Sequence, residues 1–196
     1  DSSVVLIAVK PQDARRVITE MKKGLAGKVL ISIAAGVPIS ALSKWAGKRA
    51  RICRTMPNAP ARVRSGITAA AFSASATEED RRDCVRLLKV FGEAVEVDEK
   101  AMDAVTGLSG SGPAYVFLFM DALTKAGIRA GLAAPVARKL AIHTVQGSAR
   151  LALETGLGFD ELTHQVTSPA GTTIEGLVQL EKHRLRIDVS TAVAAA

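Results

Sequence analysis

Aromatic side chains are scarce in this sequence. They make up 4% of its 196 residues, whereas apolar residues of all kinds make up 48%. A buried core must therefore be filled with Ala, Val, Leu and Ile, which suits packed helices and parallel strands better than an aromatic-rich β-sandwich. The apolar content is ample for one large domain or two small ones, so we expect a globular α/β or α-rich protein.

Cysteines and long apolar runs are also scarce. Cys53 and Cys84 are the only cysteines, and neither a CxxC nor an HExxH pattern occurs, so we expect neither a disulfide scaffold nor a metal site. No apolar run approaches the roughly 20 residues that span a bilayer, and no signal peptide is visible, which favours a cytoplasmic location. Because the sequence begins at Asp1 rather than Met, we also expect further sequence upstream.

Negative charge is the minor sign. The chain has 26 Lys and Arg against 19 Asp and Glu, and the excess lies mainly in the first half. A basic first half suits an anionic, phosphate-bearing ligand, although a solvated positive surface explains it as well. Basic residues are not interleaved with aromatic ones, so nucleic acid is not an expected partner.

Strand and helix patterns alternate as far as about residue 103. Continuous apolar runs such as Val4–Val9 and Val29–Ile33 are typical of strands that are buried on both faces. Further strands are expected at Arg51–Arg54, Gly66–Phe72 and Ala94–Val97, and Thr77 with Asp80 predicts a capped helix. Short links between these elements predict a parallel sheet with helices on its faces.

The strand pattern ends near Asp103, and only helical patterns follow. Two long helices are expected at Pro113–Arg129 and Ala134–Thr155, with shorter ones beginning near Asp160, Thr172 and Arg184. The segment Tyr115–Met120 is apolar on all sides, which indicates either a subunit interface or an intrachain core. We therefore expect two domains, 1–103 and 104–196.

A polar, glycine-containing loop precedes the helix expected at Thr172. Backbone N–H groups and the positive end of the helix dipole would make this loop a carboxylate site. An alternative explanation is a capping box, in which Thr172 and Glu175 satisfy the same N–H groups without a ligand.

Four segments, in this order along the chain, carry a resemblance to a known family. They are Ala8-Val9-Lys10-Pro11-Gln12, Arg54-Thr55-Met56-Pro57-Asn58, Val105-Thr106-Gly107-Leu108-Ser109-Gly110-Ser111-Gly112-Pro113-Ala114-Tyr115, and the spacing of Val166-Thr167-Ser168, Gly171, Thr173, Gly176-Leu177 and Leu180-Glu181. Together they resemble the pyrroline-5-carboxylate reductases over about residues 4–181. One departure is Ala170, where the family usually has a second glycine.

The resemblance implies an α/β plus all-α fold. Residues 1–103 would be the C-terminal part of a dinucleotide-binding, Rossmann-type domain, and 104–196 a helical dimerisation and substrate-binding domain. The printed sequence has no strand followed by the family's G-x-G-x-x-G phosphate loop, and its first strand resembles the fourth of the usual cofactor domain. The implied sheet is therefore incomplete, and we expect the chain as printed to have doubtful activity alone.

The resemblance also implies reduction of 1-pyrroline-5-carboxylate to L-proline, the last step of proline biosynthesis, with NADP or NAD. The implied partners are this small-molecule substrate and further copies of the chain in a homodimer or a ring of dimers. Thr173 would be catalytic, its hydroxyl lying near the ring nitrogen. The implied cofactor-binding residues are Ala8, Val9, Lys10, Pro11, Met56, Pro57 and Asn58, and the implied substrate-binding residues are Val166, Ser168, Gly171, Thr172 and Thr173.

Other interpretations stay open. The glycines at 107, 110 and 112 have the wrong order for a dinucleotide fingerprint and predict a corner between helices, with Ser111 or Gly112 as N-cap. A β-hydroxyacid dehydrogenase would need a lysine on the following helix, whose first lysine is Lys125, several turns along. A helical dimerisation module without activity is the third possibility.

Overall fold

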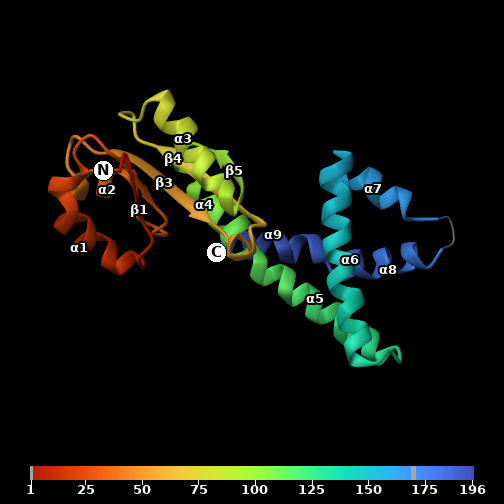
Figure 1. The fold of residues 1–196 in the computed structure, drawn as a ribbon. Coiled ribbons are helices and arrows are strands. Elements are labelled where there is room, and N and C mark those ends of the chain that lie inside the picture. Colours follow the sequence, from red (N-terminus) through yellow and green to blue (C-terminus); the bar gives the residue numbers. More distant parts are fainter. Residues whose placement is uncertain (1, 169–170) are drawn as a thin grey trace. The chain divides into compact units, whose positions relative to one another are not determined.

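A computed structural model describes residues 2–168 and 171–196 of the chain. The chain divides into two compact units, one formed by residues 1–113 and 193–196 and the other by residues 114–192. Figure 1 shows the sheet with its covering helices in the first unit and helices alone in the second.

The first unit is built on one five-stranded sheet with the strand order β1-β2-β3-β4-β5. β1–β2, β2–β3 and β4–β5 pair in parallel. This confirms the expected α/β architecture. The elements are β1 (Val4–Ile7), α1 (Pro11–Met21), β2 (Val29–Ser32), α2 (Ile39–Ala46), β3 (Arg51–Pro57), β4 (Gly66–Phe72), α3 (Glu78–Leu88), β5 (Gly92–Glu96) and α4 (Met102–Val105).

Alternate residues of the sheet face two separate cores. Leu30 and Ile52 contribute to the core under α1 and α2, whereas their strand neighbours Ile31 and Cys53 contribute to the core under α3. Every residue of β2 is buried, as its continuous apolar sequence predicts for a central strand. Side chains buried to this degree each stabilise the fold by about 1.5–3 kcal/mol.

The pairing of β3 with β4 is antiparallel, so the prediction of a wholly parallel sheet was wrong at this point. The reason lies in the length of the connection. Only residues 58–65 join the two strands, whereas a parallel crossover needs about a dozen residues or more. The short turn therefore forces the chain to reverse.

The predicted cap of α3 is present. The Thr77 hydroxyl accepts a hydrogen bond from the Asp80 N–H at 3.2 Å, and the Asp80 carboxylate accepts one from the Thr77 N–H at 2.8 Å. These two reciprocal bonds satisfy N–H groups that have no partner inside the helix. Short-range sequence pattern was sufficient here because all the interacting atoms lie within four residues.

The predicted corner between helices was wrong. Instead, α4 continues through a π-helical segment, η5 (Thr106–Gly110), into α5 (Gly112–Arg129). The Ser111 N–H donates to the Thr106 carbonyl oxygen at 2.8 Å, a bond that spans five residues and defines the wider turn. Ser111 has helical backbone angles and is not an N-cap.

The second unit consists of helices throughout its described residues, and no strand occurs there. Its boundaries match the predicted long and short helices within about two residues. Buried side chains are few: of the described residues in this unit, only Ala137 and Ala141 are buried. The helices are the rest of α5, α6 (Ala134–Thr155), α7 (Phe159–Gln165), α8 (Thr172–Lys182) and most of α9 (Leu185–Ala195).

Among the described residues, no helix has the length and apolar character needed to cross a membrane. No grouping of three or more His, Cys, Asp or Glu side chains in the described part of the chain is arranged to hold a metal ion.

Candidate active site

Two of the sequence segments predicted to bind a cofactor lie at the same edge of the sheet, after strands that β2 separates. The register aligns Ile7 of β1 with Ser32 of β2 and Arg54 of β3, and all three strands run in the same direction. Residues 8–11 leave the sheet at this level, and β3 continues to Pro57 at about 3.3 Å per residue. Ligands of open α/β sheets bind outside these carboxyl ends.

The first of these segments leads directly into a helix N-terminus. Ala8 and Lys10 are exposed, and Lys10 is the N-cap of α1 without a capping bond from its side chain. Pro11 occupies the first helical turn, so its lack of an N–H costs no helical hydrogen bond. The positive end of the α1 dipole therefore lies at this edge beside the Lys10 backbone.

A third segment at this edge was missed by sequence reasoning. Because β2 lies between β1 and β3, the turn from Ala34 to Val37 lies between the two predicted segments. Gly36 has a φ of 73°, and no atom lies within 4 Å of the place where a side chain would begin. The available signal was the glycine directly after an apolar strand, but its importance depends on the strand order.

The Asn58 side chain closes the turn between β3 and β4. Its Oδ1 accepts a hydrogen bond from the Ile67 N–H at 3.0 Å, and its Nδ2 lies 3.5 Å from the Ser109 Oγ. This turn-closing role of the amide is observed. The cofactor-binding role that the resemblance implies for Asn58 stays a prediction.

Glycines of η5 allow this segment to pack closely within the first unit. A side chain at Gly110 would collide with the Met56 side chain, and one at Gly107 would collide with the Val193 carbonyl oxygen. The glycine-rich motif therefore serves close packing against the end of β3. It does not resemble a phosphate loop, since no strand precedes it.

The predicted substrate-binding residues gather between α7 and α8 in the second unit. Val166 follows the end of α7, Ser168 lies in the loop, and Thr172 and Thr173 are the first two residues of α8. All four are exposed. Pro169 and Ala170, including the departure from the family pattern at Ala170, lie outside the described residues.

The capping box predicted for Thr172 and Glu175 was wrong. Gly171 is the N-cap of α8, so Thr172 is already inside the helix and cannot cap it. The Gly171 N–H donates to the Ser168 carbonyl oxygen at 3.0 Å, and a side chain at Gly171 would collide with the Ser168 hydroxyl. The N–H groups in the first turn of α8, beginning at Thr172, have no acceptor within the helix, and a glycine cap offers no side-chain oxygen to them.

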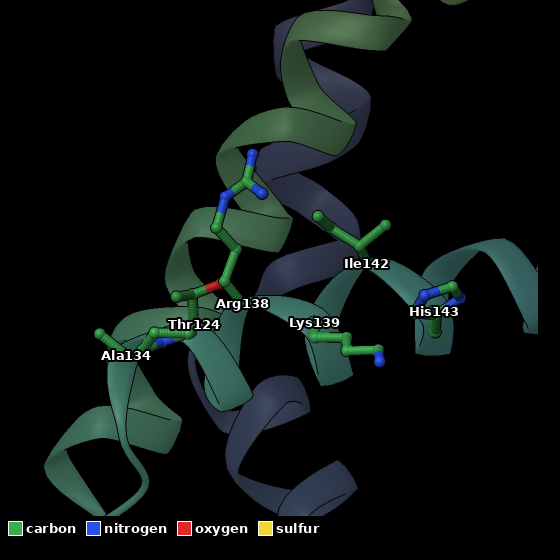
Figure 2. A pocket seen from close by; sticks show the side chains of 7 residues that line it. Thr124, Ala134, Arg138, Lys139, Ile142 and His143 are labelled. Atoms are coloured by element: carbon green, nitrogen blue, oxygen red, sulfur yellow. The ribbon is translucent and has the colours of Figure 1, made fainter.

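A separate groove of about 610 Å³ lies between the end of α5 and the start of α6. Figure 2 shows Arg138 extending to the opposite side from Lys139, with Ile142 between them and His143 beyond. The groove contains none of the predicted site residues. Diverging cations around an open apolar surface do not converge on one ligand atom, so we do not assign the active site here.

Lys125, the first lysine of α5, does not have the surroundings of a catalytic acid or base. Lys125 Nζ lies 2.7 Å from an Asp121 carboxylate oxygen, and both side chains are more than half exposed. This is an ordinary surface pair one helical turn apart. It offers no support for β-hydroxyacid dehydrogenase chemistry.

Two family models match the chain. The model described as pyrroline-5-carboxylate reductase dimerisation matches residues 99–196, and the one described as NADP oxidoreductase coenzyme F420-dependent matches residues 1–36. The pyrroline-5-carboxylate reductase of Arabidopsis thaliana is 44% identical over all of this chain and 71% of its own length. That of Escherichia coli is 38% identical over 98% of this chain and 72% of its own length.

Solved structures of similar proteins agree in fold. A pyrroline-5-carboxylate reductase from Coxiella burnetii, 37% identical, superposes with a TM-score of 0.96 over 100% of this chain and 73% of its own. A Plasmodium falciparum pyrroline carboxylate reductase solved with NADP bound is 33% identical, with a TM-score of 0.89 over 98% of this chain and 74% of its own. From sequence and fold together, the chain belongs to the pyrroline-5-carboxylate reductase family.

Proposed function

We propose that this protein catalyses the NAD(P)H-dependent reduction of 1-pyrroline-5-carboxylate to L-proline. The observation that carries the proposal is that residues 8–11 and 56–58 lie at the same carboxyl edge of the sheet. The chain that places them there is 44% identical over its full length to the pyrroline-5-carboxylate reductase of Arabidopsis thaliana. Reduction of a cyclic imine needs two aligned reactants and a held carboxylate more than a strong general acid. This requirement is consistent with a site that contains no catalytic His or Cys among the proposed residues.

The edge fits the nicotinamide half of a dinucleotide. The Gly36 turn leaves its backbone unobstructed on the side where a Cβ would lie, and the α1 N-terminus adds a positive field. When bound, NADP or NAD in its reduced form supplies the hydride. Residues Ala8, Val9, Lys10 and Pro11 would line one side and Met56, Pro57 and Asn58 the other.

The α7–α8 loop suits the substrate carboxylate. The backbone N–H groups at the start of α8 would hold the carboxylate, together with Val166, Ser168 and Gly171 around it. The Thr173 hydroxyl would then hydrogen-bond near the ring nitrogen and orient the imine. Gly171 has no side-chain oxygen, so no side-chain cap from the described residues competes with a ligand for these donors.

We also propose that the chain acts as a homodimer, or a ring of dimers, through its helical part. The dimerisation family model over residues 99–196 and the exposed apolar segment at 115–120 support this. We keep the predicted division into residues 1–103 for the dinucleotide and 104–196 for dimerisation and substrate as a proposal: the family model begins nearby, at residue 99, whereas the compact units divide at residue 113. A cytoplasmic location stays a prediction from the sequence.

Imine-dependent oxidation of NADPH and NADH tests the activity. Two proteins would be assayed: the chain as printed, and the same chain joined at its N-terminus to the segment that precedes the matched region in the Arabidopsis relative. We expect turnover in the joined protein, because the family resemblance implies that the phosphate-binding strand and loop lie in this preceding segment. Cofactor binding without any proline formed would contradict the proposed reaction.

Thr173→Ala in the joined protein tests the substrate site, with Thr172→Ala as the neighbouring control. Loss of the Thr173 hydroxyl should lower kcat/KM by about 10–100-fold, since one positioned hydrogen bond contributes about 1.5–3 kcal/mol to a charged partner. Thr172 would contact the substrate carboxylate through its backbone N–H only, so Thr172→Ala should keep kcat/KM within about threefold of the parent value. Equal activity of both variants and the parent would mean that the Thr173 hydroxyl is incidental.

A further inference from the structure

One carboxylate holds together two of the segments at the carboxyl edge of the sheet. The Glu99 Oε1 accepts a hydrogen bond from the Ile39 N–H at 2.6 Å and another from the Arg54 Nη1 at 3.1 Å. Ile39 begins α2, directly after the turn that follows β2, and Arg54 lies in β3 two residues before Met56. Glu99 is 60 residues from Ile39 in sequence and 45 from Arg54.

Helix α2 depends on this distant carboxylate for its N-terminus. Its N-cap is Pro38, which makes no side-chain cap, and its first turn contains no acidic residue. Glu99 therefore supplies from elsewhere in the first unit both the acceptor and the negative charge that a helix N-terminus favours. The position of the Ala34–Val37 turn is tied to Glu99 as a consequence.

Arg54 depends on the same carboxylate for its counter-charge. Its side chain is 11% exposed, so the guanidinium is largely withdrawn from water. The other nearby carboxylate, Asp103, lies 3.9 Å away with a side chain that is 98% exposed, which makes it a weak, solvent-screened partner. Glu99 is the better-placed counter-charge, and removing it would leave a buried cation with little compensation.

The chain that follows Glu99 contacts the end of β3 a second time. Eleven positions later Gly110 packs on Met56, and beside it Ser109 lies 3.5 Å from the Asn58 amide. The last part of β3 is thus held at Arg54 by Glu99 and at Met56 and Asn58 by η5. Both contacts come from residues 99–110, which belong to the dimerisation family model and not to the sheet.

We infer that Glu99 is a positioning residue for the cofactor edge, which fixes the Ala34–Val37 turn and the Met56–Asn58 segment relative to each other through the Ile39 N–H and the Arg54 guanidinium. The expected effect of Glu99 on enzyme kinetics rests on the proposed function. Its expected effect on the rigidity of the two segments rests only on the two hydrogen bonds. Nothing in the role requires Glu99 to touch cofactor or substrate.

Hydrogen exchange at backbone amides of the chain as it exists tests whether Glu99 keeps the two segments rigid. Glu99→Gln keeps an oxygen for the Ile39 N–H but removes the charge that faces Arg54, and Asp103→Asn is the matched control. We expect exchange to become about tenfold faster at residues 34–39 and 54–58 in Glu99→Gln, with α1 and α3 unchanged, because local opening is independent of global unfolding. Asp103→Asn should leave all of these rates unchanged.

Uniform acceleration across the first unit would overturn the inference, since Glu99 would then be a general stabiliser. Unchanged exchange in Glu99→Gln would overturn it as well. Arg54→Lys is the second variant: it keeps the charge but not the guanidinium geometry, and should affect residues 54–58 more than residues 34–39.

The kinetic part is measured in the joined protein described above, with the parent assayed first. Glu99→Gln should raise KM for the nicotinamide cofactor about tenfold and leave KM for the imine within about twofold. The reason is that the displaced segments, residues 34–37 and 56–58, are proposed to bind the cofactor and not the imine. Glu99→Asp should recover part of the loss. Equal changes in both KM values would overturn the inference, whereas a parent without turnover would contradict the proposed function and leave the exchange result to decide the role of Glu99.

Discussion

The two units of this chain differ sharply in how much they bury. The first unit encloses large side chains completely, among them Ile18, Leu25 and Leu30. The second buries only two alanines among its described residues, while Phe117, Leu118 and Phe159 are 60%, 71% and 79% exposed.

This contrast shows that a helical pattern does not guarantee a core. An exposed apolar surface of this extent is unusual for a monomer and indicates an interaction site. For segment 115–120 the sequence allowed either an interface or an intrachain core, and the exposure of its side chains supports our proposal of an interface. The first unit has its own core, and we propose that the second gains one when another copy covers it.

The strongest test of this contrast is Phe117→Asp in the second unit. A charge placed in an apolar interface has no partner there, so we expect association to weaken at least about 100-fold, or about 3 kcal/mol. Sedimentation at several protein concentrations measures this. Val63→Asp, at an exposed apolar residue of the first unit, is the matched control and should leave association unchanged.

If Phe117→Asp still formed dimers of full affinity, the exposed surface of α5 would not be the interface. In that case the contrast in burial would need another explanation within the chain.

The two units should differ in how their unfolding depends on protein concentration, and truncation of a buried side chain identifies the transition of the first unit. Ile18→Ala removes part of the core under α1 and should cost about 2–5 kcal/mol in the first unit. That loss should be the same at all protein concentrations, whereas the unfolding midpoint of the second unit should rise with concentration. Calorimetry over a hundredfold range of concentration measures both, and a concentration-independent midpoint for both units would remove the distinction.

The threonines at the N-termini of α3 and α8 should differ, by a smaller amount, in what they contribute to the free energy of unfolding. Thr77→Ala breaks a complete capping box in the first unit and should cost about 1 kcal/mol. Thr172→Ala in the second unit should cost less than about 0.5 kcal/mol, because Gly171 is the cap there. Urea unfolding of the two variants compares them, and equal losses would restore the capping function that the sequence pattern suggested for Thr172.

The least perturbing test uses the two native cysteines, which both lie in the first unit. A hydrogen bond with Cys84 and burial raise the pKa of the Cys53 thiol. A raised pKa keeps this thiol protonated and unreactive at pH 8, where an exposed thiol with a pKa of about 8.5 is partly ionised. Alkylation of Cys53 should therefore require opening of the core and proceed at the opening rate, and rapid labelling of Cys53 in the native protein, located by peptide mass, would contradict the tight core.

Local patterns predicted much of the fold correctly. The apolar runs of β1 and β2, the Thr77 cap and the bounds of α6 depend on neighbouring residues, whose interactions are encoded within a few positions. The same kind of reasoning failed at Thr172 and at residues 106–112. There the true state depended on a glycine cap and on a π-helical turn that packs against β3 and the C-terminal residues.

The sequence by itself determined the family, the alternation of strands with helices, and the segments that carry the proposed site, because these are properties of residue type and spacing. Tertiary structure alone decided that residues 8–11, 34–37 and 56–58 share one edge, since strand order and register bring together residues far apart in the chain. It alone also assigned Glu99 to two partners at the carboxyl edge of the sheet. A hydrogen bond across 60 residues has no local pattern, because its geometry exists only after the sheet and its helices have packed.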